Sequence, residues 1–157
     1  MGDPATVVDR SMEDLGDGLP GGELDRPIVR ILLVDDNDDF RRQAARFLAS
    51  VPGCRVEAFA ASGREAVELA RRDDIDLVLM DLSMPGMGGF EATQQIKERP
   101  GAPRVVILSL GAGEAYRIAS EAAKADGFLS KLDFTAQIGS LIEKLFPGRR
   151  GQEEKNT

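Results

Sequence analysis

The sequence contains no histidine and a single cysteine, Cys54. Without histidine there is no Cys/His zinc site and no histidine-dependent catalytic triad, and one cysteine cannot form an internal disulfide. No apolar run approaches the ~18 residues that suggest a membrane span, and the N-terminus lacks the basic start and apolar stretch of a signal peptide. We therefore expect a chain without a membrane segment, in a reducing, cytoplasmic setting.

A length of 157 residues and a hydrophobic content of 42% fit one domain with tails. Residues 1–27 hold seven acidic residues and two arginines, a net charge of −5, with Gly and Pro and no apolar periodicity. We expect residues 1–27 and 148–157 to be flexible tails around a domain at 28–147. Neither tail carries a long basic stripe, so direct nucleic-acid binding is not expected.

Between the tails, β-type apolar runs alternate with segments of helical periodicity. The pattern predicts strands at 28–34, 54–60, 75–80, 104–110 and 127–130, and helices at 38–51, 62–72, 90–98, 114–125 and 134–146. Ser62 and Glu65 are spaced as a capping box for the second helix. Strict alternation predicts an α/β fold, a doubly wound parallel sheet of five strands covered on both faces.

Polar side chains follow four of the predicted strands. In an open parallel sheet the ligand site lies beyond the carboxyl ends of the strands. The side chains expected to converge there are Asp35 and Asp36 after the first strand, Asp81 after the third, Ser109 at the end of the fourth and Lys131 after the fifth. The turn at 84–89, MPGMGG, is placed to fold over them.

Three clustered carboxylates repel one another, and a hard divalent cation relieves that repulsion. Oxygen ligands suit Mg²⁺, with Mn²⁺ as a substitute, and Mg²⁺ typically combines one or two carboxylates with a phosphate oxygen. An aspartate beside such a cation, with a lysine and a hydroxyl nearby, is equipped for phosphoryl transfer through an aspartyl phosphate.

Four segments together resemble response-regulator receiver domains of two-component signalling: LLVDDN, LVLMDLSMPGMGGFEA, VVILS and KADGFLSK. Each segment alone is weak evidence, but the four in this order are specific, and the resemblance covers about residues 28–146. It implies a (βα)5 fold of the flavodoxin-like, CheY-like kind, with strand order 2-1-3-4-5. The segment after Asp81 is similar to receivers of the NarL type.

The resemblance also implies a role for each site residue. Asp81 is the expected phosphoacceptor, receiving its phosphoryl group from a sensor histidine kinase or a phosphotransfer protein. The other implied roles are Mg²⁺ binding by Asp35, Asp36, Asp81 and the backbone carbonyl of Ser83, phosphate contact by Lys131, and switching by Ser109 and Phe128. The chain is then no enzyme beyond its own phosphotransfer and autodephosphorylation.

Several positions depart from the family pattern or have plainer interpretations. Leu132 follows the lysine, where proline or a small or acidic residue is usual. Ser83 and Gly111 are small and leave room for water, which favours a short-lived phosphoryl group. Simpler roles fit the remaining acids: Asp38 and Asp39 in the first turn of a helix, and Asp73, Asp74 and Asp76 as solvated turn residues.

Three alternatives remain. A haloacid-dehalogenase-type phosphohydrolase also uses an aspartate nucleophile, but it needs a second aspartate where Ser83 stands. The chain is otherwise a degenerate receiver that works without phosphate, or the receiver fragment of a NarL-type DNA-binding regulator. We expect a stand-alone receiver, a monomer or a phosphorylation-dependent dimer, whose downstream protein partner the sequence does not identify.

Overall fold

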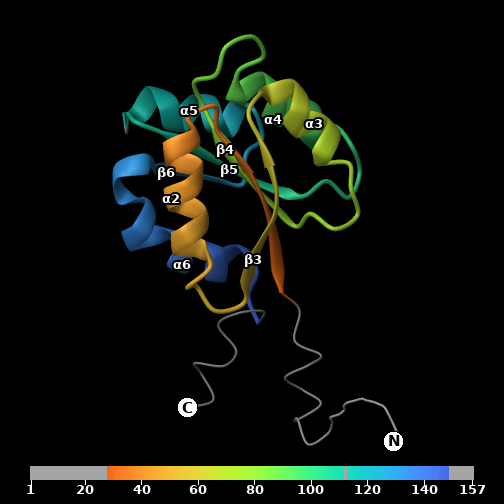
Figure 1. The fold of residues 1–157 in the computed structure, drawn as a ribbon. Coiled ribbons are helices and arrows are strands. Elements are labelled where there is room, and N and C mark those ends of the chain that lie inside the picture. Colours follow the sequence, from red (N-terminus) through yellow and green to blue (C-terminus); the bar gives the residue numbers. More distant parts are fainter. Residues whose placement is uncertain (1–27, 112, 149–157) are drawn as a thin grey trace, which may run out of the picture.

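The computed structural model describes residues 28–111 and 113–148. The expected flexible tails lie outside these residues, except for Gly148. The described strands are β2 (Val29–Val34), β3 (Cys54–Ala60), β4 (Leu77–Asp81), β5 (Arg104–Ser109) and β6 (Gly127–Ser130). The described helices are α2 (Asp38–Leu48), α3 (Gly63–Leu69), α4 (Gly89–Lys97), α5 (Glu114–Ala122), α6 (Phe134–Leu145) and the short 3₁₀ helix η1 (Lys131–Asp133) (Figure 1).

The strands form one parallel sheet in the order β3-β2-β4-β5-β6. Counted along the chain this is 2-1-3-4-5, so the predicted fold class and strand order are confirmed. The winding direction reverses between β2 and β4, which makes the carboxyl ends of these two strands the place for a ligand. Asp81 pairs with Leu108 and Ser109 with Ser130, so the strand ends lie level with one another.

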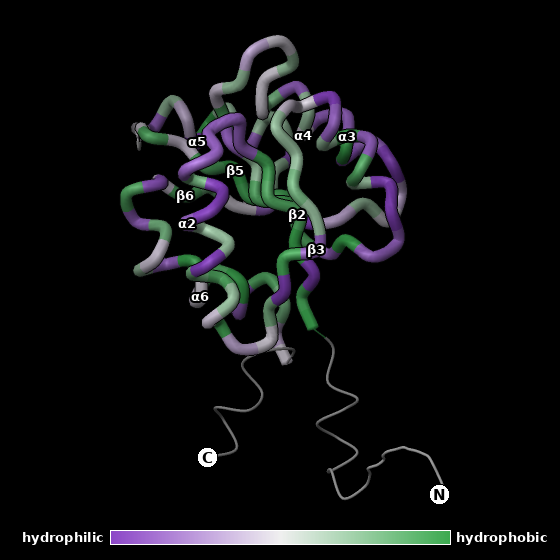
Figure 2. The backbone as a smooth tube through the Cα atoms, viewed as in Figure 1, coloured by the Kyte–Doolittle hydropathy of each residue, from purple (hydrophilic) through white to green (hydrophobic). Residues whose placement is uncertain are grey.

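The central strands are buried on both faces, as expected for a parallel sheet with helices on each side. Ile31 and Leu33 pack into a core with α2 and α6, whereas Leu32 and Val34 pack into a second core with α3 and α4. In Figure 2 the central strands β2 and β5 are accordingly coloured as hydrophobic, whereas hydrophilic and hydrophobic residues alternate along the helices. Within the described residues, no helix is both long and apolar enough to cross a membrane.

Local signals account for most element boundaries. Ser62 caps α3 by accepting from the Glu65 backbone N–H at 3.1 Å, while the Glu65 carboxylate accepts from Ala61 N–H rather than from Ser62. The helix expected to run to residue 125 ends at Ala122. The reason is Lys124, which takes a left-handed conformation with φ of 69°, so that Ala125 N–H bonds back to the Ser120 carbonyl.

The expectation that Asp76 is a solvated turn residue is wrong. Its carboxylate accepts hydrogen bonds from the Arg30 backbone N–H and from Arg30 Nε, both at 2.9 Å. The side chain is mostly buried, with 16% exposed. Asp76 therefore joins the start of β4 to β2. The expectation for Asp38 and Asp39 is confirmed, because both lie in the first turn of α2.

Candidate functional site

The carboxyl edge of the sheet brings three of the predicted side chains into direct contact. Asp35 follows β2, Asp81 ends β4, and Lys131 follows β6. The Lys131 ammonium Nζ lies 2.6 Å from Asp35 Oδ2 and 2.9 Å from Asp81 Oδ1. Both carboxylates are nearly inaccessible to solvent, with side-chain exposures of 1% and 6%. One lysine thus bridges the ends of β2 and β4.

Asp36 completes an acidic cluster at this edge. Ligand oxygens of Asp35, Asp36 and Asp81 all lie within 4.8 Å of one another, and Asp36 is the exposed member. Asp35 Oδ2 is buried and forms an ion pair with the Lys131 ammonium. Three carboxylates with one ammonium leave a negative excess. A hard divalent cation with oxygen ligands fits this set of donors.

The electrostatics of the cluster shift two pKa values. Burial raises the pKa of the Asp81 carboxyl, and the neighbouring negative charge of Asp35 adds to this, while the hydrogen bond from Lys131 opposes it. Burial lowers the pKa of Lys131, but hydrogen bonds to Asp35 and Asp81 together outweigh burial, and the net shift is upward. The ammonium therefore stays charged, and Asp81 is a carboxylate that the fold holds at some cost.

The start of α2 fixes the orientation of Asp35, by contacts that the sequence analysis did not identify. Asn37 caps the helix by accepting from Phe40 N–H at 2.9 Å, and its own N–H donates to Asp35 Oδ1 at 2.9 Å. Arg41 Nη1 donates to the Asp35 carbonyl at 2.5 Å. An Asn directly before two helix-start acids was the signal for the cap, but no sequence pattern indicated the arginine contact.

The loop at 84–89 packs against the backbone beside the site. Gly89 N–H donates to the Leu82 carbonyl at 3.1 Å, and a Cβ atom on Gly89 would lie 2.4 Å from the Asp81 carbonyl oxygen. A Cβ on Gly63 would lie 2.5 Å from the Met87 carbonyl oxygen. Two glycines therefore allow the loop to approach the end of β4 and the start of α3. The side chains of the loop also contribute to packing, because Met84 is buried in the core shared with α3 and α4, and Met87 packs against that core.

Ser109 lies at the same edge, in the last position of β5, and is buried. Its hydroxyl accepts a hydrogen bond from Gly111 N–H at 3.0 Å. A Cβ on Gly111 would lie 2.5 Å from the ring of Tyr116, so this glycine makes room for the first turn of α5. Ser83 is exposed two residues beyond Asp81. The roles of Ser109 and of the Ser83 carbonyl stay predictions.

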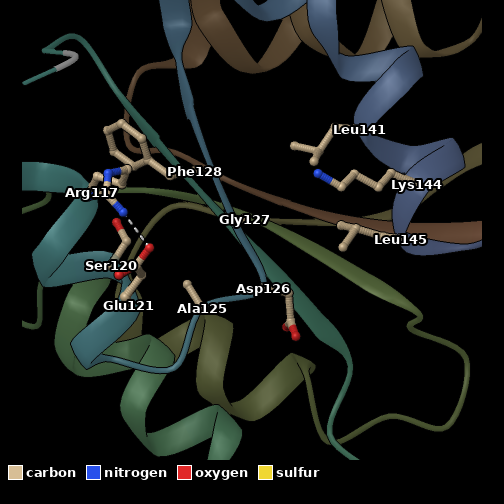
Figure 3. A pocket seen from close by; sticks show the side chains of 10 residues that line it. All are labelled: Arg117, Ser120, Glu121, Ala125, Asp126, Gly127, Phe128, Leu141, Lys144 and Leu145. Atoms are coloured by element: carbon tan, nitrogen blue, oxygen red, sulfur yellow. Dashed lines mark hydrogen bonds and ion pairs between the residues drawn. The ribbon is translucent and has the colours of Figure 1, made fainter. Parts of the chain in front are cut away.

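Phe128 lies in β6 and lines a cavity away from the carboxylates. The cavity has a volume of about 430 Å³ and lies between α5, β6 and α6. Figure 3 shows Phe128 near Arg117, which forms an ion pair with Glu121 at 2.6 Å. Phe128 pairs with Ile107 in the sheet, two positions before the pairing of Ser130 with Ser109. The ring therefore lies on a strand that adjoins Ser109 and borders an open space.

Comparison with known proteins identifies the family. The family model described as the response regulator receiver domain matches residues 31–143. Response regulator UvrY of Escherichia coli K12 is 33% identical over 123 residues, which cover 78% of this chain and 56% of that protein. The nitrate/nitrite response regulator protein NarL of the same organism is 35% identical over 101 residues, covering 64% of this chain and 47% of NarL.

The solved structures give the same result. A two-component response regulator of the LuxR family from Aurantimonas sp. SI85-9A1 has a TM-score of 0.72 and 38% identity, and the match covers 78% of this chain and 88% of that one. The chain spans about half the length of the curated relatives named above. The chain belongs to the response regulator receiver domain family, and its relatives include a regulator of the NarL type.

Proposed function

We propose that this chain takes a phosphoryl group onto Asp81 from the phosphohistidine of a sensor histidine kinase or of a phosphotransfer protein. The observation that carries the proposal is the position of Asp81. It is a buried carboxylate at the switch point of the sheet, 2.9 Å from the Lys131 ammonium and within an acidic cluster. The matching family model and the NarL-type relatives support the same function.

In the proposed step, an Asp81 carboxylate oxygen attacks the phosphorus of the donor. The phosphorus–nitrogen bond of the phosphohistidine breaks, the imidazole leaves and takes up a proton, and an acyl phosphate forms on Asp81. Lys131 Nζ, which already touches this carboxylate, follows the transferred oxygens. Ser109 turns its hydroxyl from the Gly111 N–H to donate to a phosphoryl oxygen.

Asp35, Asp36, Asp81 and the backbone carbonyl of Ser83 are the residues that would hold Mg²⁺, or Mn²⁺ in its place. The clustered carboxylate oxygens, of which those of Asp35 and Asp81 share one ammonium, support this assignment. A cation held there would supply positive charge against the oxygens of the phosphoryl group. Asp35 is the residue best held for the task, since Asn37 N–H donates to its other oxygen.

Hydrolysis returns the site to its starting state. Water attacks the phosphorus, the bond to the Asp81 oxygen breaks, and inorganic phosphate leaves. Ser83 is exposed and Gly111 has no side chain, so neither position shields the phosphorus from water. We therefore propose a short-lived phosphoryl group. A half-life of many hours in the purified protein, measured by intact mass after removal of the donor, would contradict this.

In the proposed function, phosphorylation changes the protein surface that is offered to a partner. A phosphoryl group adds about −1.5 to −2 charges, which favours movement of Ser109 toward it and a new position for Phe128. The cavity beside Phe128 gives the ring space to move (Figure 3). Helix α5 borders both groups, and exposes Ile118 with 54% of its surface accessible. We propose that a downstream protein in the cytoplasm binds this face of α5, whether the receiver is a monomer or a dimer.

Phosphorylation with a small donor tests the central claim. The full chain is incubated with Mg²⁺ and acetyl phosphate, and intact mass is followed for wild type, Asp81→Asn and Asp39→Asn. The last variant is a matched control, since Asp39 is an exposed acid on α2. We expect one phosphoryl adduct in wild type and in Asp39→Asn, and none in Asp81→Asn. No wild-type adduct would favour a degenerate receiver, and steady turnover of phosphate esters a hydrolase.

A further inference from the structure

The ring of Phe40 lies against the ammonium that serves the site. Lys131 Nζ lies over this ring, 4.5 Å from its centroid, which is within the ~6 Å range of cation–π attraction. The same nitrogen lies 2.6 Å from Asp35 Oδ2 and 2.9 Å from Asp81 Oδ1. Of these three neighbours of the ammonium, the two carboxylates are charged and the aromatic ring is not.

Phe40 is itself held from two directions. Its backbone N–H donates to the Asn37 cap, so its place is set by the start of α2. Its ring meets the ring of Phe134 edge-on, with centroids 5.8 Å apart and an interplanar angle of 71°. Phe134 is 97% buried and begins α6, three residues after Lys131. One ring thus contacts both the lysine side chain and the helix that follows the lysine.

We propose that Phe40 is a positioning residue for Lys131. A lysine side chain has many rotamers, and a point charge alone does not fix its direction. The two carboxylates attract the ammonium from the sheet edge, and the face of Phe40 limits where it can move. The ammonium is then in place beside Asp81 before a phosphoryl group arrives. This inference rests on the proposed function, because it concerns the residue that contacts the transferred phosphoryl oxygens.

Phe47 provides a matched control on the same helix. Its ring also meets Phe134 edge-on, with centroids 6.2 Å apart and an interplanar angle of 66°. Among the described residues, the cation–π pair found is Lys131 over Phe40, and Phe47 has no cation over its ring. Phe40→Leu and Phe47→Leu therefore remove a similar packing contact with Phe134, but only the first removes the ring beneath the ammonium.

The contact can be tested without phosphate. In the wild-type chain, the protons on the last side-chain carbons of Lys131 lie over an aromatic face, so their NMR signals move upfield. The Lys131 signals are identified by their absence in Lys131→Arg. We expect the upfield shift to disappear in Phe40→Leu and to persist in Phe47→Leu. A Lys131 signal unchanged in Phe40→Leu would overturn the proposal.

The effect on the reaction is tested by making the face of the Phe40 ring less negative while leaving the shape of the ring nearly unchanged. Phenylalanines with one, two and three fluorines, introduced at position 40 alone, weaken cation–π attraction stepwise. We expect the rate of Asp81 phosphorylation by acetyl phosphate to fall stepwise, reaching about a two- to fivefold loss with three fluorines. Phe47 fluorinated in the same way leaves the rate unchanged.

The outcomes separate the two proposals. If chains with each fluorinated ring at position 40 form the adduct at the wild-type rate, the positioning role is overturned and the proposed function stays intact. Absence of any adduct in the wild type overturns the proposed function, and the positioning role for phosphoryl transfer with it. Rates that fall with fluorination at position 40 and not at position 47 support both proposals.

Discussion

At the amino end of the sheet carboxylates and cations are matched, whereas at the carboxyl end carboxylates are in excess. Asp126, just before β6, accepts from Lys97 Nζ at 2.8 Å, from Val105 N–H at 2.8 Å and from Arg104 Nη1 at 3.2 Å. Asp76, just before β4, is saturated in the same way by Arg30. At this end each of these buried acids has a full set of donors.

At the carboxyl end, Asp35, Asp36 and Asp81 share a single ammonium, that of Lys131. The Lys131 ammonium is divided between buried oxygens of Asp35 and Asp81, and burial raises the pKa of Asp81. The two ends use the same residue types. What differs is the balance of charge. Matched acids join strands together, and we propose that the excess of carboxylates at the carboxyl end serves to bind a cation and a phosphoryl group.

The largest expected effect is at the matched end. Asp126→Ala removes the carboxylate and leaves the Lys97 ammonium and the Val105 N–H without this acceptor. Because the Lys97 and Asp126 side chains are only 16% and 15% exposed, we expect a loss of about 2–3 kcal/mol in the free energy of unfolding. Thermal melts should show a Tm lower by about 6–9 °C. Asp73→Ala, an equal change in charge at an exposed position, is the control, and equal melting of both variants would contradict the prediction.

Metal binding tests the carboxyl end of the sheet. We propose that Mg²⁺ binds the folded acidic cluster and not the unfolded chain, in which case it should stabilise wild type by about 1.4 kcal/mol at ten times its Kd. Asp36→Asn and Asp81→Asn should lose most of this gain. Asp76→Asn, at the matched end, should start from a lower Tm and still gain the full amount. A metal-dependent rise in Tm that survives in both cluster variants would place the cation elsewhere.

Asp81→Asn should produce a smaller change, in the direction opposite to Asp126→Ala. Since the pKa of Asp81 is raised in the fold, the folded chain binds this proton more tightly than the unfolded chain does. Stability is therefore lost as pH rises through the ordinary pKa of an aspartate toward the raised one. Without metal, Asp81→Asn should melt above wild type at pH 7, and the difference should shrink as acid protonates Asp81. A lower Tm for the variant at pH 7 would contradict this.

The amino-acid sequence was sufficient to predict which residues lie at the strand ends, but not the side-chain contacts that they make. Alternating runs predict the order of strands and helices, and parallel strands deliver Asp35, Asp81 and Lys131 to one edge, because these signals are local in the chain. Sequence gave no indication that Asp76 is bound by Arg30 or that Phe40 lies against Lys131. Such contacts depend on how side chains far apart in the sequence point once the sheet and helices have packed.

The smallest expected effect separates two neighbouring kinds of acid. Asp36→Asn and Asp39→Asn change the net charge equally, three positions apart, but Asp39 lies in the first turn of α2, with its side chain 78% exposed and paired with Arg42 at 2.6 Å. Its charge complements the helix dipole, an effect of about 0.3–1 kcal/mol. We therefore expect Asp39→Asn to lower Tm slightly, while its Mg²⁺ affinity and rate of phosphorylation stay at the wild-type level. Calorimetric titration with Mg²⁺ distinguishes two explanations. If cations are attracted only by the general negative charge, both substitutions weaken Mg²⁺ binding equally. If Asp36 is part of a specific site, only Asp36→Asn weakens it.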